Sequence, residues 1–488
     1  MGEKNLTGMM KICAAILFGG SLVCGMGVCR ASASEVAVNK TNFPDDTFRA
    51  YVREYVDKDQ DGILSEQEIA GKKKLKLVGE KEVALSEKTE QRQKLNVTGI
   101  QYLTGLKNVD LSGWKLSGTD FSALTSLRKL TVSYANLQEL DVSALTQLKQ
   151  LDCSDNNISV LDLSEVQKLT KLDCSRNELR VLDIRKHTKL TSLRCSDNHI
   201  SQLQVANLKE LKVLTCAGNR IGKLNVLHAS GLWKLRCGYN YIKKLSVWGN
   251  PSLRILDCSG NDITSLNLYR NTRLRDLDVD NNSLTSLDLR RNTQLELLEC
   301  SDNKIKTLDI SKLKKLRVLK CSNTSLSKLD LSQNRNLKGL YARNLSIPEL
   351  NLSAQQNLEI INCMNGKLTS LDLSKCKRLR RLNCTFNQLG ALDISNNPKL
   401  WECKVKNNQL KELILGQNSS LRFLSCENNA LTQLDVSQCV NLNAGSASSF
   451  LFSGNPLSSI IVSEINCEED SDNEKLARLS GVSWVFVI

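Results

Sequence analysis

The chain has 488 residues, of which 41% are hydrophobic and only 5% aromatic, and it carries a formal net charge of +14. This length and apolar content predict a large folded body, and the low aromatic share argues against an aromatic-rich barrel. The positive charge predicts nonspecific attraction to anionic polymers or anionic lipids.

The segment 1–33 has the pattern of a secretory signal peptide. Lys4 and Lys11 come before an apolar run from Ile12 to Cys29, and Ala31-Ser32-Ala33 supplies a small-x-small cleavage pattern. The alternative is a retained membrane anchor, which the glycines and the short length disfavour. We therefore expect a secreted, extracellular or cell-surface protein with no transmembrane segment in its mature chain.

Residues 34–94 are predicted to form a helical cap that contains a calcium loop of the EF-hand type at residues 57–68. Loops of this pattern offer oxygen ligands at fixed places, and a central glycine permits the sharp turn. Here the glycine is Gly62. The predicted Ca²⁺ ligands are Asp57, Asp59, Asp61, the carbonyl of Ile63, Ser65 through water, and Glu68.

The sequence around the loop favours two helices. Pro44 followed by two aspartates begins the first, and Ser65 with Glu68 forms a capping box for the second. The alternative interpretation is an acidic turn that binds no metal. Because only one such loop is present, we expect calcium to act as a structural clamp near the start of the next domain, not as a sensor.

From Leu148 to Val436 the chain keeps one fixed repeat length without insertion or deletion. The repeat reads L-x-x-L-x-C-x-x-N-x-[IL]-x-x-L-x-[LIV] plus a variable stretch, which is a leucine-rich-repeat pattern with cysteine in place of one leucine. It predicts an α/β leucine-rich-repeat solenoid, a right-handed superhelix of 21-residue coils with a parallel inner sheet. We assign the solenoid to residues 95–443, including two less regular coils at its start.

One column of the repeat is nearly all cysteine, with valine or alanine in the three other coils. Neighbouring cysteines would lie about 4.8 Å apart in a parallel sheet with their Cβ atoms pointing the same way, which does not suit a disulfide. We therefore expect free, buried thiols that act as small hydrophobic groups. The oxidation states of Cys376, Cys403, Cys439 and Cys467, which lie outside this column, are left open.

A second column is mostly asparagine. A buried amide can donate to and accept from backbone groups, so we expect this column to join each coil to the next. Thr324, Leu345 and Gly366 interrupt it in three successive coils. The interruption indicates either a bend or a tolerated loss of the pattern.

Partner-binding residues are expected on the concave face of the solenoid. The column four residues before the cysteine position carries eight cations and two tryptophans, and the column two residues after it adds two aromatic residues. Such a stripe fits a protein or glycan ligand, or an anionic cell-wall polymer; the alternative is a solvated surface that maintains solubility. The candidate residues are Lys149, Lys212, Trp233, Tyr239, Arg254, Arg275, Arg317, Lys338, Arg380, Phe386, Trp401 and Arg422.

Residues 444–488 are predicted to form a C-terminal cap, because an open solenoid must cover its last apolar face. The expected elements are a strand, an acidic helix around Glu468 to Leu479, and a final strand in which Trp484, Phe486 and Ile488 share one face.

The calcium loop, the segment from Leu95 to Leu106 and the Leu-Asp-Cys-Ser-x-Asn coils together resemble the internalin-type leucine-rich-repeat proteins of Gram-positive bacteria, and most of all the cysteine-ladder internalins. The resemblance covers about residues 40–440. It implies a secreted or surface protein with a concave face that binds host proteins, glycans or envelope polymers. The family often ends in a cell-wall sorting signal, which the residues from Ser483 to Ile488 do not match, so covalent anchoring is not expected.

No pattern typical of an enzyme is present. The three histidines lie in separate coils, and the sequence has no phosphate-binding loop, zinc pattern or nucleophile elbow. We predict a noncatalytic binding protein, with an adhesin as its most specific form and an envelope-associated scaffold held by charge as the alternative. Nucleic acid is not an expected partner, because the sequence has no recognised nucleic-acid module.

Overall fold

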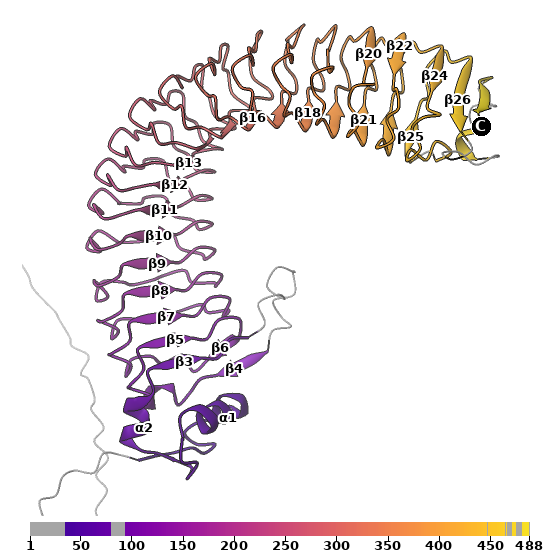
Figure 1. The fold of residues 1–488 in the computed structure, drawn as a ribbon. Coiled ribbons are helices and arrows are strands. Elements are labelled where there is room, and N and C mark those ends of the chain that lie inside the picture. The colour runs from indigo at the N-terminus through magenta and orange to yellow at the C-terminus, as the bar shows by residue number, and fades with distance from the viewer. Residues whose placement is uncertain are drawn as a thin grey trace, which may run out of the picture.

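The computed structural model describes residues 35–79, 93–446, 448–463, 465, 471–474 and 481–487. The predicted signal peptide lies outside these residues. The described chain winds into a long arch of stacked coils, with a small helical unit at the N-terminal end (Figure 1). Among the described helices, none has the length and apolar character needed to cross a bilayer.

The main sheet follows the inner curve of the arch and is entirely parallel. Each strand pairs in register with the strand one coil away, as Leu235 of one coil does with Leu256 of the next. This arrangement confirms the predicted leucine-rich-repeat solenoid. The strands are β3 (Lys74–Lys76), β5 (Asn108–Asp110), β7 (Lys129–Thr131), β8 (Gln150–Asp152), β9 (Lys171–Asp173), β10 (Ser192–Arg194), β11 (Val213–Thr215), β12 (Lys234–Arg236), β13 (Ile255–Asp257), β14 (Asp276–Asp278), β15 (Leu297–Glu299), β16 (Val318–Lys320), β17 (Gly339–Tyr341), β18 (Ile360–Asn362), β19 (Arg381–Asn383), β21 (Glu402–Lys404), β23 (Phe423–Ser425) and β25 (Phe450–Leu451).

The core is built from the repeated apolar columns. In the coil that contains β12, Leu232, Leu235, Cys237 and Ile242 are fully buried. Each buried leucine contributes about 2 kcal/mol of transfer free energy, and each coil covers the apolar edge of its neighbour. All fourteen described cysteines are buried, and those of the column are free thiols, as are Cys376 and Cys403. Cys467 lies outside the described residues.

The asparagine column joins successive coils as predicted. Asn240 donates from Nδ2 to the carbonyl of Cys216 in the previous coil at 3.0 Å, and its Oδ1 accepts from the backbone N–H of Ile221 at 2.9 Å. Thr324 still donates from its hydroxyl to the Cys321 carbonyl at 2.8 Å. The main sheet also pairs in register without a break from β16 to β19, so the interruption does not disturb the pairing of the strands.

A second amide column, which the sequence analysis missed, runs along the outer side of the coils. Asn271 is fully buried and donates from Nδ2 to the Val247 carbonyl at 3.0 Å and to the Asn250 carbonyl at 2.9 Å. The recurrence of asparagine at one place of the repeat, from position 250 onward, was the available signal. The side-chain amides that donate to the carbonyl 24 residues earlier are those of Asn250, Asn271, Asn292, Asn334, Gln355 and Asn397.

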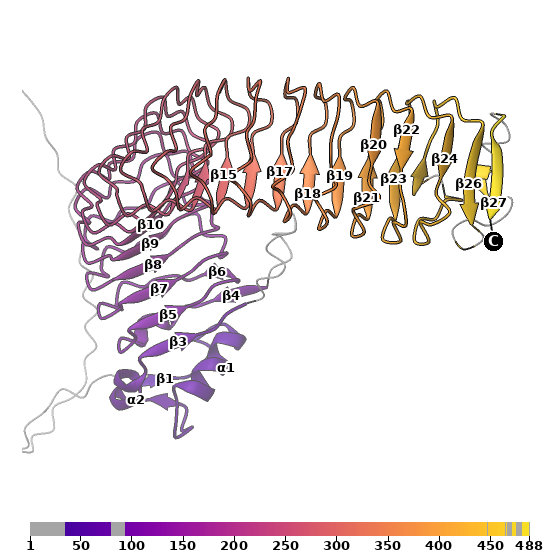
Figure 2. The ribbon, with the colours of Figure 1, turned by 45° about the horizontal axis from the view of Figure 1, so that its top comes forward.

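Shorter sheets form elsewhere, several of them on the outer curve toward the C-terminal end (Figure 2). In β27 the side chains of Trp484 and Phe486 pack against the core and Val485 is exposed, as the alternation predicted. Most of the predicted acidic helix lies outside the described residues. The parallel pairs or sheets are β4 (Lys94–Asn96) with β6 (Lys115–Ser117), β20 (Ala391–Asp393) with β22 (Glu412–Ile414), and β24 (Gln433–Asp435) with β26 (Ser459–Ser463) and β27 (Ser483–Val487).

The N-terminal unit contains α1 (Asp46–Tyr55), α2 (Glu66–Gly71) and an antiparallel pair of β1 (Val36–Ala37) with β2 (Ile63–Leu64). The 3₁₀ helix η3 (Ile100–Tyr102) follows β4. Asp45 caps α1 by accepting from the Phe48 N–H, and its other oxygen accepts from the Asn96 N–H of β4 at 3.0 Å. The unit therefore contacts the first coils directly, and β3, from the range predicted as cap, already belongs to the main sheet.

Candidate functional site

The predicted binding column lies at the entry to the strands of the main sheet. Trp233 comes directly before β12 and Trp401 directly before β21, and the two side chains are 38% and 40% exposed. In-register pairing brings the whole column onto one edge of the concave face. All its predicted cations are exposed except Lys338, which is half-buried and forms an ion pair with Glu359 at 3.4 Å.

Tyr239 and Phe386 occupy the turn that follows each strand, where the backbone is left-handed. Their φ angles are 53° and 56°, and the side chains are 69% and 51% exposed. Most other coils place Asn, Asp or Gly at this position, because these residues adopt a positive φ at low cost. A large aromatic residue with a positive φ is an outlier, and it lowers the stability of the fold by about 1 kcal/mol or more. Because these aromatic side chains are exposed, packing does not explain why they are present, which indicates a role in binding.

The strands between these two columns carry charges that mostly pair with one another. Arg194 lies 3.8 Å from Asp173, and Lys320 lies 2.8 Å from Glu299. Asp278 and Asp280 converge on Glu299, with carboxylate oxygens within 4.8 Å of one another. Burial raises the pKa of Asp278 to about 7 and that of Asp280 to about 6. These three carboxylates therefore form one local acidic cluster on the face.

Two grooves open beside the tryptophans. One of about 590 Å³ runs across β7 to β11 and ends at Trp233, with Lys171, Asp173 and Lys212 among its lining. The other, of about 670 Å³, is formed around Trp401. Its lining is Arg380, Lys399, Trp401, Ser420, Arg422, Phe423 and Asn441, which includes three cations and no carboxylate.

The predicted calcium loop folds so that three of its carboxylates converge. Oxygens of Asp57, Asp59 and Asp61 lie within 4.8 Å of one another, and Gly62 has a φ of 83°. Asp57 is 2% exposed; its Oδ2 accepts from the Gly62 N–H at 3.1 Å, and its Oδ1 has no hydrogen-bond partner among the described residues. Burial raises the pKa of Asp57. A buried carboxylate without a counter-ion beside two other acids fits a site for a hard cation.

Glu68 lies across the loop from these aspartates. Burial opposes ionisation of Glu68, but hydrogen bonds from the Ser65 N–H, the Ser65 hydroxyl and the Lys58 N–H lower its pKa. The capping box of Ser65 and Glu68 at the start of α2 is present as predicted. The strand β2 pairs with β1, so the N-terminal segment, not a second loop, supports this loop.

Comparisons with known proteins identify similar solved structures. The functional domain of InlJ from Listeria monocytogenes, which includes a cysteine ladder, is 29% identical with a TM-score of 0.64, over 88% of this chain and 83% of that one. An internalin, InlF, from the same species is 22% identical with a TM-score of 0.60, over 69% and 99%. YopM from Yersinia enterocolitica is 21% identical with a TM-score of 0.54, over 81% and 90%. No protein-family model and no curated protein matches the chain.

The buried cysteine column of this chain agrees with the cysteine ladder of the first of these structures. The chain is a leucine-rich-repeat solenoid that is similar to the internalins.

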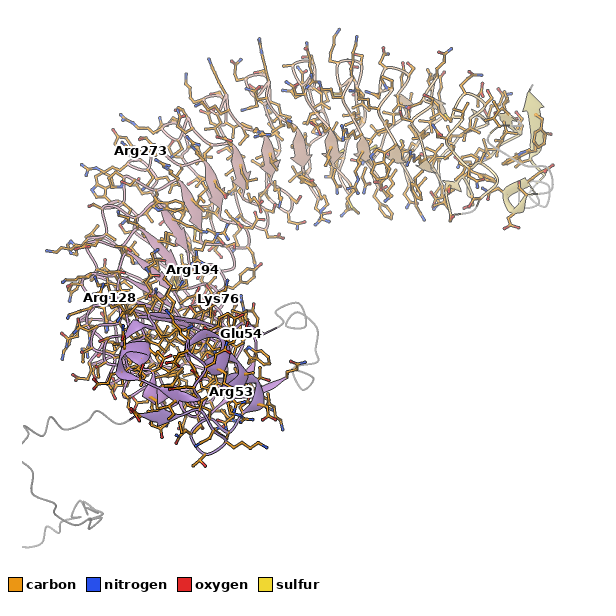
Figure 3. The ribbon with its side chains drawn as sticks, turned by 60° about the horizontal axis from the view of Figure 1, so that its bottom comes forward. Arg53, Glu54, Lys76, Arg128, Arg194 and Arg273 are labelled. Atoms are coloured by element: carbon orange, nitrogen blue, oxygen red, sulfur yellow. The ribbon has the colours of Figure 1, made fainter. Side chains whose placement is uncertain are left out.

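This leucine-rich-repeat solenoid also carries an exposed aromatic stack that the sequence analysis missed. Trp248 and Tyr269, in turns on the outer side of two successive coils, stack at 6.3 Å between ring centroids. The guanidinium of Arg270 lies 4.5 Å from the Trp248 ring, and that of Arg291 lies 4.2 Å from the Tyr269 ring. Arg273, at the outer rim in Figure 3, is near this stack in sequence, whereas Arg194 lies on the inner strands. The signal in the sequence was that both aromatic residues occupy the same place of successive repeats.

Proposed function

We propose that this protein is a noncatalytic binding protein, secreted or displayed at a cell surface, which recognises a protein or glycan through its concave face. The observation that carries the proposal is the gathering of exposed tryptophans, cations and strained aromatic residues along the edges of one continuous sheet. Aromatic residues and arginine are the residue types that dominate binding energy at interfaces. An adhesin is the specific form of this proposal.

A second candidate function is an envelope-associated scaffold that charge holds to anionic wall polymers. The net charge of +14 favours it, since a strongly positive surface attracts polyanions without a specific pocket. The two candidates differ in their dependence on the tryptophans, because charge-driven adsorption follows salt concentration and not the identity of one aromatic residue.

Binding of labelled residues 34–488 to epithelial cells and to Gram-positive envelopes, in calcium buffer, tests the proposal. We expect saturable binding to cells that the Trp233→Ala, Trp401→Ala double variant loses. Trp248→Ala is the matched control, because Trp248 is 41% exposed but lies in the outer stack. Salt-sensitive binding to envelopes alone, equal in all variants, would exclude the adhesin and support the scaffold.

We also propose that the loop at residues 57–68 binds Ca²⁺ and acts as a structural clamp. The convergence of Asp57, Asp59 and Asp61 and the unpartnered buried oxygen of Asp57 support this proposal. The carbonyl of Ile63, Ser65 and Glu68 would complete the oxygen ligands expected for calcium. A bound cation would neutralise the acidic loop and hold α1, β2 and α2 together at the start of the solenoid.

A further inference from the structure

Each of the two concave tryptophans lies between two cations of the same column. Lys212 and Arg254 occupy the equivalent position one coil before and one coil after Trp233, and Arg380 and Arg422 do so for Trp401. We call each set of three a cation–tryptophan–cation triad. No other residue of this column is a tryptophan, so the column contains two triads, separated by eight repeats.

The backbone holds both triads in the same way. The Trp233 N–H donates to the Lys212 carbonyl at 3.0 Å, and the Arg254 N–H donates to the Trp233 carbonyl at 2.8 Å. In the second triad, the Trp401 N–H donates to the Arg380 carbonyl at 3.0 Å, and the Arg422 N–H donates to the Trp401 carbonyl at 2.9 Å. Because the two indoles are also exposed to nearly the same extent, the triads are two copies of one arrangement.

The charges of the triads are available to a ligand. Within the described part of the chain, the four flanking cations form no ion pair with a carboxylate within 4.0 Å, whereas Lys338 in the same column pairs with Glu359. Each of these four cations therefore lies beside an exposed indole ring without a counter-ion among the described residues. Such a pair suits a ligand that carries a negative charge next to an apolar face.

The groove at Trp401 specifies the chemistry further. The two neutral polar side chains that line this groove already donate to backbone carbonyls. The Ser420 hydroxyl donates to the Pro398 carbonyl at 2.7 Å, and Asn441 Nδ2 donates to the Ser419 carbonyl at 2.6 Å. Three cations remain as donors, and no carboxylate lines the groove to accept from ligand hydroxyls. This balance favours an anionic unit over a neutral sugar.

We propose that the two triads bind the same chain of an anionic polysaccharide, each holding one sugar ring by its apolar face and its carboxylate, sulfate or phosphate by the flanking cations. This inference rests on the proposed binding function of the concave face. Two similar sites about 38 Å apart along the sheet, at about 4.8 Å per strand, match a ligand that repeats its chemistry. An acidic protein surface would have no reason to present one unit twice in this way.

Two-point attachment has a measurable consequence. A polymer long enough to reach both triads gains avidity of about 100-fold or more over a short oligomer, and loses that gain when either site is removed. We would therefore measure the affinity of the full chain for long polygalacturonate, dextran sulfate and phosphomannan, and for a galacturonate trimer. Neutral dextran and polyglutamate are the comparison ligands, and all measurements are made at two salt concentrations.

The expected result is that at least one long anionic polysaccharide binds, and that Trp233→Ala and Trp401→Ala each lower its affinity by about 100-fold. For the trimer, each variant should halve the stoichiometry and leave the affinity of the remaining site unchanged. Trp248→Ala should change neither. The polymer that responds identifies carboxylate, sulfate or phosphate as the anionic group.

Three results would overturn the inference. Polymer binding that weakens as salt is added but is unchanged by either tryptophan substitution would support only the scaffold that is held by charge. Tryptophan-dependent binding of polyglutamate equal to that of the polysaccharides would assign the triads to an acidic protein. Absence of polymer binding, combined with tryptophan-dependent binding to cells, would leave the proposed function standing and reject this ligand class.

Discussion

Gly260 lies directly against the ring of Tyr239 in the preceding coil. A Cβ atom at Gly260 would stand 2.8 Å from Cδ1 of Tyr239, and Gly260 itself has a φ of 59°. The glycine thus leaves the space in which the exposed tyrosine ring rests. Gly218 occupies the same column with a φ of 64°, but its absent Cβ faces the flexible carboxylate of Asp197.

Gly260→Ala is expected to displace the ring of Tyr239, whereas Gly218→Ala displaces only the carboxylate of Asp197. Both variants should lose about 1 kcal/mol of unfolding free energy, because alanine at a positive φ is strained. Only Gly260→Ala should also weaken ligand binding to the concave face. Urea unfolding with binding measured in parallel checks this, and equal binding by both variants would show that Tyr239 does not contact the ligand.

The coil-joining amides give a second prediction. Asn240→Ala removes the acceptor for the Ile221 N–H and a donor to the Cys216 carbonyl, and leaves both backbone groups buried. We expect a loss of about 2–6 kcal/mol of unfolding free energy, from about 1–3 kcal/mol for each of the two unsatisfied groups. Asn240→Thr should retain part of this stability, as Thr324 does in its own coil.

The reverse change, Thr324→Asn, should stabilise the protein by about 1 kcal/mol. Hydrogen exchange of the amides in the adjacent coils checks both substitutions, since the effect in a solenoid is confined to neighbouring repeats. Uniform destabilisation along the whole chain by Asn240→Ala would contradict this nearest-neighbour account.

The thiols of the cysteine column should be inert in the folded protein. Burial raises the pKa of both Cys216 and Cys321 to about 12, so the thiolate that reacts is scarce at pH 8 and shielded from solvent. We expect native protein to react with iodoacetamide only as fast as it unfolds, and denatured protein to react completely. Rapid labelling of native protein, located by peptide mapping, would contradict the buried ladder.

Much of this fold could be predicted because the repeat fixes it. A strict repeat length places Leu235 against Leu256 and Asn240 under Ile221 before any coordinates are known. The repeat length does not predict the side-chain contacts that are specific to individual coils. The contact of Trp248 with Tyr269 and the convergence of Asp278 on Glu299 depend on which side chains fill variable positions in adjacent coils, and on their rotamers.

Asp278 predicts how stability depends on pH. Its pKa in the folded protein is about 7, raised by burial above the value of about 3.9 in an unfolded chain. Folding therefore favours the protonated form, and the contribution to stability is full below about pH 4 and is lost as the pH rises through 7. Asp278→Asn should raise the melting temperature at pH 8 and leave it unchanged at pH 4. An equal shift at both values would indicate a packing effect.

Removal of calcium provides the last prediction. In EDTA, Asp57→Asn should be more stable than the wild type, because it removes a buried carboxylate whose Oδ1 has no hydrogen-bond partner among the described residues. In calcium the order should reverse: the wild-type unit gains about 2.7 kcal/mol at a free concentration about 100-fold above its Kd, and the variant gains much less.

Hydrogen exchange of residues 57–68, with and without calcium, measures this directly. Asp141→Asn is the control, since Asp141 accepts from the Ser143 N–H in an exposed turn far from the loop. The wild type and this control should gain protection in α1 and α2 on addition of calcium. If calcium leaves the exchange of the wild-type loop unchanged, its three converging aspartates form only an acidic turn. The pairing of β1 with β2 would then be the contact that holds the loop.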